Sequence, residues 1–112
     1  MRVAVLGVKL ESLERIPNLS FEHLPEKISE LGRSIWSVDL VIVKGSHPDA
    51  SLVAFLSKII GKKIVCVGRP GSRILRDLSD FTVAEDQITD FLKKIASDNM
   101  TSGSATSQTS GL

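Results

Sequence analysis

Three runs of β-branched residues are followed by glycine, hydroxyl and basic residues. The short segments at the ends of these runs hold the side chains best suited to chemistry. The runs are Arg2–Leu6, Val38–Lys44 and Lys63–Val67. Glycine lets backbone N–H groups approach an anion closely, and arginine offers a planar fork of donors that fits phosphate or carboxylate. The candidate ligand-binding residues of the three segments are Gly7, Lys44, Gly45, Ser46, His47, Arg69, Gly71, Ser72 and Arg73. Their chemistry predicts binding of a small phosphorylated or nucleotide-like anion.

Acid–base or nucleophilic chemistry has fewer candidates. His47 precedes Pro48 in a loop and could transfer a proton or contact phosphate, although a lone loop histidine is more often simply solvated. Asp49 is expected to be the third-position carboxylate of a capping box that begins at Ser46. Ser72 has no histidine within its own loop and would need His47 opposite it to act as a nucleophile. The sequence therefore assigns no catalytic residue.

The sequence gives little support for a metal or a cofactor. Its single cysteine excludes a disulfide framework and a cysteine-clustered zinc site, and Cys66 alternates within an apolar run as a core residue would. His23 lies near Glu22 and Glu26, but one histidine and two carboxylates make a weak metal site, so we expect none. Neither a dinucleotide fingerprint nor a P-loop lysine motif occurs, and the identity of any cofactor stays unknown.

The strands that must position these loops follow from hydrophobic patterning. The segment 38–43 is almost continuously apolar, and 64–67 is similar, which is typical of strands buried on both faces of a parallel sheet. Leu19–His23 alternates apolar and polar residues as an edge strand does, and Asp80–Val83 is a short fifth candidate.

Three segments with apolar residues at helical spacing predict helices. The first has Pro25 in its first turn. The second opens with a capping box at 46–49 and ends at Gly61, where a left-handed cap is needed. The third opens with a capping box at 82–85. No helix is expected between the fourth and fifth strands.

This alternation predicts a three-layer α/β sandwich of flavodoxin-like, Rossmann-like type, with a mainly parallel sheet of about five strands in the order 2-1-3-4-5. The crossover Val8–Asn18 is near the minimum length, so the second strand is parallel only if a one-turn helix at Leu10–Arg15 fits. Ligands of such sheets bind beyond the carboxyl ends of the strands, where the strand order reverses. We therefore expect the loops after strands 1, 3 and 4 to form one site.

Length and composition indicate one domain and exclude several classes of partner. Residues 1–97 are expected to form the domain, and residues 98–112, which are rich in Ser, Thr and Gly, are expected to be a flexible tail. The formal net charge of +1, a single Trp and no Tyr count against a nucleic-acid partner. No apolar run approaches the ~20 residues that span a bilayer, and the start is too short for a signal peptide. We expect a soluble, cytoplasmic protein with no membrane partner.

Charge is distributed unevenly along the chain. Residues 44–76 contain seven cations and one acid, a net of +6, whereas residues 77–98 contain two cations and six acids, a net of −4. Pairing of the basic middle of one copy with the acidic end of another would give a homodimer or a larger assembly. Trp36 is expected to be half-buried, although a dimer contact there is an open alternative.

The segment 38–70 resembles two groups of α/β proteins. Its order of an apolar strand, Gly45-x-x-Pro48-Asp49, an apolar helix and Gly61-Lys62-Lys63-Ile64-Val65 is similar to the nucleoside deoxyribosyltransferase-like superfamily. The pair Arg69-Pro70 is similar to the pair after the fourth strand of small Toll/interleukin-receptor-like proteins. The resemblance implies a nucleotide-binding type of fold. The deoxyribosyltransferases carry a catalytic glutamate eight residues before the glycine; Val53 stands there, so no catalytic residue is carried over.

Three functions follow as hypotheses. The first is a domain that binds a phosphorylated or nucleotide-like anion, favoured because three loops with suitable residues converge. The second is a non-catalytic interaction or oligomerisation module. The third is an enzyme acting on nucleosides or sugar phosphates with His47 or Asp49 as acid or base, against which the missing helix acid counts.

Overall fold

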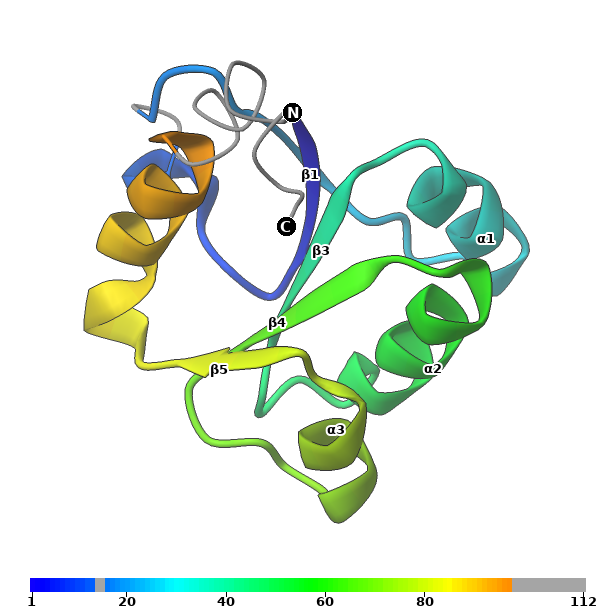
Figure 1. Ribbon diagram of the computed structural model, residues 1–112. Coiled ribbons are helices and arrows are strands. Elements are labelled where there is room, and N and C mark those ends of the chain that lie inside the picture. The colour runs from blue at the N-terminus through cyan, green and yellow to red at the C-terminus, as the bar shows by residue number, and fades with distance from the viewer. Residues whose placement is uncertain (14–15, 98–112) are drawn as a thin grey trace, which may run out of the picture.

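A five-stranded parallel sheet forms the centre of the protein. The computed structural model describes residues 1–13 and 16–97, and the predicted tail at 98–112 lies outside the described residues. The strands are β1 (Arg2–Leu6), β2 (Ser20–His23), β3 (Leu40–Lys44), β4 (Lys63–Val67) and β5 (Phe81–Val83). Every neighbouring pair is parallel, in the order β2-β1-β3-β4-β5 (Figure 1). The predicted sheet is confirmed, including the direction of its second strand.

Helical segments cover both faces of this sheet. The helices α1 (Ile28–Trp36), α2 (Ala50–Ile60) and α3 (Arg73–Leu78) lie on one face (Figure 1). The 3-10 turn η1 (Leu10–Ser12) and the helical residues 88–97, which follow the 3-10 turn η2 (Glu85–Gln87), lie on the other. The short η1 turn is the one-turn helix that the parallel crossover required. The structure is thus a three-layer α/β sandwich of flavodoxin-like type.

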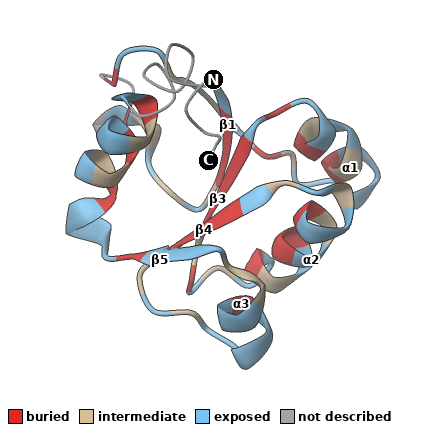
Figure 2. Ribbon diagram, viewed as in Figure 1, coloured by how far each residue is buried: buried red, intermediate tan, exposed pale blue. Residues whose placement is uncertain are grey.

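Two apolar cores hold the layers together, one on each face of the sheet. Successive strand residues point to opposite faces, so Val41 and Val43 join the core under α1, α2 and α3 while Ile42 joins the other core. All three side chains are fully buried, as Figure 2 shows for the central strands. Burial on both faces is the reason that the central strands are continuous apolar runs.

The predicted starts of the first and third helices are wrong, because Leu24 and Thr82 are hydrogen-bonded or paired to strands of the sheet. The N–H of Leu24 donates to the carbonyl of Val5 at 3.0 Å, so α1 begins only at Ile28. Thr82 pairs with Cys66 inside β5, and the chain turns helical after it, first through η2.

The capping box at 46–49 is also wrong. The helix α2 begins at Ala50, and no side chain makes a cap hydrogen bond at its N-cap Asp49. The N–H of Asp49, which a capping box would direct to the Ser46 hydroxyl, donates instead to Nδ1 of His47 at 3.0 Å. The far end is as predicted, because Gly61 has φ +90° and closes α2 in the left-handed conformation.

The helix α3 was missed by the sequence analysis. Ser72 is its N-cap and accepts the Leu75 N–H at 3.1 Å, which is the usual capping role of serine. Leu75 is its one fully buried side chain. Six residues with one core position are too few to show a helical period, so the capping serine was the available signal.

Gly45 fastens the loop after β3 to the loop after β4. Its N–H donates to the Val67 carbonyl at 2.9 Å, and its carbonyl accepts the Gly71 N–H at 2.8 Å. A Cβ at position 45 would overlap the carbonyl oxygen of Arg69, and one at position 71 would lie 2.7 Å from the Gly45 oxygen. Both glycines are therefore required by this backbone contact.

Replacing Gly45 should cost far more than replacing a glycine in open space. We expect Gly45→Ala to lower the free energy of unfolding by about 3 kcal/mol or more, because the added methyl must displace the Arg69 backbone. Gly32 in α1 has nothing within 4 Å of its ideal Cβ, so Gly32→Ala should raise stability by about 0.5–1 kcal/mol. Urea unfolding measures both changes, and equal stabilities of the two variants would contradict the described contact.

Asp80 ties α2 to the edge of β4. Its carboxylate accepts the Ile64 N–H at 2.8 Å and contacts Lys58 Nζ at 3.0 and 3.1 Å. Partial burial raises the pKa of this carboxyl group, but the Ile64 hydrogen bond and the Lys58 charge outweigh it. The net result is a pKa below the ordinary aspartate value.

This lowered pKa predicts a stability that depends on acid pH. Asp80→Asn should lower the free energy of unfolding at neutral pH by about 1 kcal/mol. A carboxyl with a lowered folded-state pKa contributes fully above its unfolded pKa of about 4 and loses this contribution as pH falls through the folded value. The two proteins should therefore converge in stability toward about pH 2. Asp77→Asn is the control, because Asp77 contacts Arg76 only at 3.6 Å in an exposed pair. A difference between wild type and Asp80→Asn that is unchanged at low pH would contradict this account.

Candidate functional site

The loops after β1, β3 and β4 lie side by side at the carboxyl edge of the sheet, as predicted. Gly7 after β1 has φ +80°, and a Cβ there would lie 3.0 Å from Lys44 Cβ and 3.1 Å from His47 Cδ2. The next two loops are joined through Gly45. Since the chain leaves β1 toward η1 on one face and leaves β3 toward α2 on the other, the strand order reverses here.

Three of the predicted binding residues have structural roles in this edge. Gly45 is buried, and Gly71 donates its N–H to it, so neither amide is directed at open solvent. Ser72 caps α3, and its hydroxyl also lies 2.8 Å from the Ser51 hydroxyl of α2. These contacts explain the residue types without a ligand.

Lys44 faces an acid that the sequence analysis did not place near the site. Its Nζ lies 3.3 Å from Oε1 of Glu85 in η2. Both residues line a cavity of about 320 Å³ together with Val8, Lys9, Val67 and Ile88. Glu85 offsets the Lys44 charge, so this part of the edge is less attractive to an anion than the basic loop residues alone suggest. The sequence predicts Glu85 only as part of a helix-capping box, and nothing local in the sequence places it opposite Lys44.

His47 is oriented by its own loop. It is half-buried, and because Nδ1 accepts the Asp49 N–H, its neutral form carries the proton on Nε2 and can donate from there. Within the described residues, no hydrogen bond or ion pair joins His47 to the carboxylate of Asp49 or to Ser72. Ser46 is exposed beside it. The arrangement suits a hydrogen-bond donor to a ligand better than a general base.

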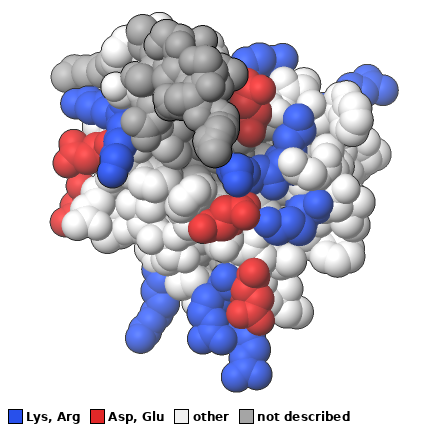
Figure 3. All heavy atoms as spheres, in the orientation of Figure 1, with Lys and Arg blue, Asp and Glu red and all other residues white. Residues whose placement is uncertain are grey.

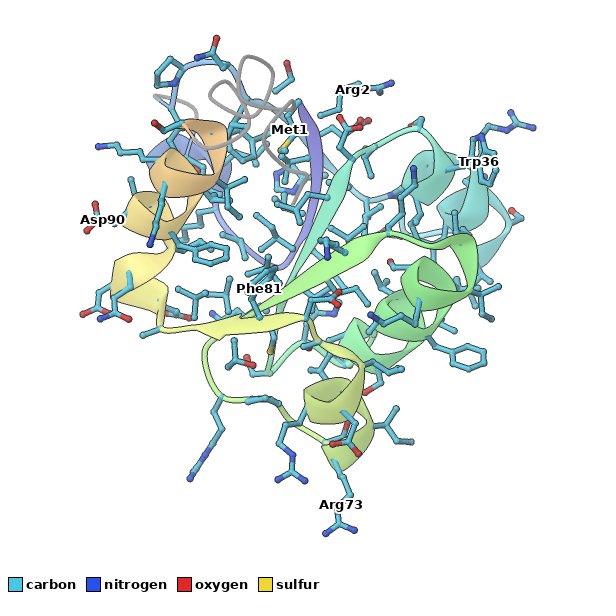
Figure 4. All side chains as sticks on the ribbon, viewed as in Figure 1. Met1, Arg2, Trp36, Arg73, Phe81 and Asp90 are labelled. Atoms are coloured by element: carbon cyan, nitrogen blue, oxygen red, sulfur yellow. The ribbon has the colours of Figure 1, made fainter. Side chains whose placement is uncertain are left out.

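A second hollow at the same edge is strongly basic. It measures about 370 Å³ and is lined by Arg69, Pro70, Gly71, Ser72, Arg73 and Arg76. We call it the arginine hollow. Figure 3 shows basic side chains extending from the lower edge of the molecule, where α3 lies, with acidic atoms between them, and Figure 4 shows Arg73 directed away from the ribbon.

The arginines of this hollow are scarcely neutralised. Arg76 contacts Asp77 at 3.6 Å in an exposed pair, which is weak in water. No described residue forms an ion pair or hydrogen bond with the side chain of Arg69 or Arg73. Arg76 was not among the predicted site residues. Its position one turn after Arg73 would have indicated it, had α3 been predicted.

Cys66 is a core residue, as expected. It is fully buried in β4, and burial raises the pKa of its thiol although a hydrogen bond with Ser79 acts in the opposite direction. Glu22, part of the weak metal candidate, is paired with Arg2 at 2.8 Å. Among residues 1–13 and 16–97, no group of three or more His, Cys, Asp or Glu side chains could hold a metal ion. Over the same residues, no helix has the length and apolar character needed to cross a bilayer.

The chain matches no protein-family model, no curated protein sequence and no solved structure in comparisons with all three. A functional conclusion therefore rests on the fold and on the geometry of the site.

Proposed function

We propose that this protein binds a small phosphorylated ligand, or another small anion of similar charge, in the arginine hollow. The observation that carries the proposal is the concentration of Arg69, Arg73 and Arg76 around one hollow that no acidic side chain lines. Two of these arginines have no partner among the described residues. Guanidinium groups form paired hydrogen bonds with phosphate oxygens and keep their charge at any physiological pH.

Hydrogen bonds hold the loop that carries Arg69 and the start of α3, the helix that carries Arg73 and Arg76, and this favours binding. The hydrogen bond from Gly71 to Gly45 fixes the middle of the loop, and the ring of Pro70 restricts its backbone. Ser72 fixes the other end through its contacts with α3 and α2. A ligand therefore has to order the arginine side chains but not the backbone beneath them.

The wider prediction of one site across three loops remains part of the proposal. A ligand larger than phosphate could extend from the arginine hollow toward Ser46 and the Nε2–H of His47. Such an extension would suit a nucleotide-like molecule, in line with the resemblance to the nucleoside deoxyribosyltransferase-like superfamily. Val53 is fully buried, so the position where those enzymes carry glutamate supplies packing in this chain.

Two other functions stay open as alternatives. An enzyme acting on nucleosides or sugar phosphates would depend on His47 or Asp49, and its support would be turnover of such compounds that disappears in His47→Ala. An interaction module has a separate observation in its favour, since several large apolar side chains on α1, α2 and α3 are exposed.

The proposal predicts anion binding that depends on two particular arginines. Inorganic phosphate, sulfate, nucleotides and sugar phosphates can be screened by thermal shift, and a ligand at a hundred times its Kd should add about 2.7 kcal/mol of stability. For the best ligand, Arg69→Gln and Arg73→Gln should each raise the Kd measured by calorimetry about tenfold, corresponding to about 1.4 kcal/mol.

The control removes the same charge from the opposite layer. Lys94→Gln lies in the helical segment 88–97 and should leave the Kd within about twofold, because only screened long-range attraction changes. The absence of any ligand in the screen would contradict the proposal. So would equal losses of affinity in Lys94→Gln and the two arginine variants, since net charge alone would then explain binding.

A further inference from the structure

The helix α2 is mainly apolar on its outer side as well as on its buried side, although the outer side faces solvent. It packs between α1 and α3 over the sheet. Its eleven residues, Ala50–Ile60, include one charged residue, Lys58, which pairs with Asp80 on the flank toward β5. Opposite its buried side lie Leu52, Phe55 and Ile59, which are 36%, 54% and 66% exposed. A helix that is hydrophobic all round is normally covered on all sides.

Neighbouring helices extend this apolar surface. Ile28 of α1 is 68% exposed and lines a hollow of about 420 Å³ together with Leu52. Ile74 of α3 is 61% exposed, two residues after Ser72, whose hydroxyl contacts α2. We call these five residues, Ile28, Leu52, Phe55, Ile59 and Ile74, the apolar face. Several large exposed apolar side chains on neighbouring helices are typical of an interaction site in a folded protein.

We propose that the apolar face binds the same face of a second copy of this chain, with the two α2 helices antiparallel about a two-fold axis at Phe55. Phe55 is the middle residue of Ala50–Ile60. A two-fold axis there places Phe55 against its own copy and brings Leu52 near Ile59 of the second copy, since the two residues lie three and four positions from Phe55 on opposite sides. Such a self-complementary patch is what a two-fold dimer requires.

The charges at the two ends of α1 and α2 suit this orientation. The amino ends of α1 and α2 carry exposed Glu26, Lys27, Glu30 and Asp49, which are three acids and one base. The other end carries Arg33, Asp39, Lys62 and Lys63, which are three bases and one acid, and that acid is bonded to the Arg2 backbone N–H. Antiparallel pairing brings the acidic end of one copy over the basic end of the other, and it also opposes the helix dipoles favourably.

Trp36 lies at the outer end of α1 and extends the same layer. It was expected to be half-buried but is 70% exposed, with Lys62 Nζ 5.8 Å from its ring centroid (Figure 4). The dimer differs from the pairing of basic middle and acidic end suggested by the sequence, because residues 88–97 cover the opposite face of the sheet. None of the five residues of the apolar face lines the arginine hollow.

A charge exchange at the symmetry axis tests the proposal. Sedimentation velocity of the full chain should show a dimer, and Phe55→Glu and Phe55→Lys should each raise its Kd at least 100-fold, since residue 55 faces its own copy. A mixture of the two variants should recover the dimer, because glutamate then faces lysine. Gln87→Glu is the control, since it adds the same charge as Phe55→Glu on the opposite layer and should leave the Kd unchanged.

Several results would overturn the proposal. A wild-type chain that is monomeric at about 100 μM would do so, because a dimer weaker than this is not a stable interface. So would a dimer that persists in Phe55→Glu, or a mixture of the two variants that stays monomeric although circular dichroism shows both to be folded. If either charge variant fails to fold, Phe55→Cys decides: with oxidised glutathione it should form a disulfide-linked dimer, whereas Gln87→Cys should not. Equal cross-linking of both cysteine variants would contradict the dimer.

Discussion

The backbone contact between Gly45 and the Arg69–Gly71 turn is the constraint on which the functional edge of this protein depends. The two central strands β3 and β4 end beside each other, and their loops continue in contact because neither Gly45 nor Gly71 carries a side chain. The start of α3 is thereby placed against the start of α2, where Ser51 and Ser72 meet. The position of the arginine hollow and the alignment of α2 with α3 both follow from this one contact.

The same contact changes what the glycines of the site can do. Glycines at the carboxyl ends of strands commonly expose backbone N–H groups to an anion, but here the amides of Gly45 and Gly71 are used between the loops. Lys44 is offset by Glu85. The positive charge in the arginine hollow, which no acidic side chain lines, lies on the arginine side chains of the loop after β4 and of α3. Recognition by guanidinium groups therefore replaces recognition by backbone amides in the proposed function.

The sequence predicted the architecture well because burial leaves a direct trace in residue types. A strand such as β3, buried on both faces, has to be apolar throughout, and the helices between strands impose parallel order. Helix starts are predicted wrongly where a tertiary contact competes with a local motif. The Asp49 N–H donates to the His47 ring instead of to the Ser46 hydroxyl, and pairing with Cys66 keeps Thr82 in the sheet.

The location of the site could be predicted from the sequence, but the contacts of its side chains could not. Adjacency of the three loops follows from the topology alone, since the carboxyl ends of parallel strands share one edge. The topology does not predict which of these side chains stay available to a ligand, because Glu85 reaches Lys44 from a turn that follows a later strand. The exposure of Trp36 and of the outer side of α2 was likewise hidden, since an apolar helix gives the same pattern whether its outer side meets solvent or a second chain.

The most direct test of the central claim is a titration of the ¹⁵N-labelled protein with inorganic phosphate, observed through its backbone amide resonances. If the anion binds in the arginine hollow, the amides of Arg69 and of residues 71–76 should shift progressively and saturate together, while those of Gly7 and Val8 stay in place. Shifts centred on Val8 and Lys44, or no saturable shift at any residue, would contradict the assignment of the site to the β4–α3 loop.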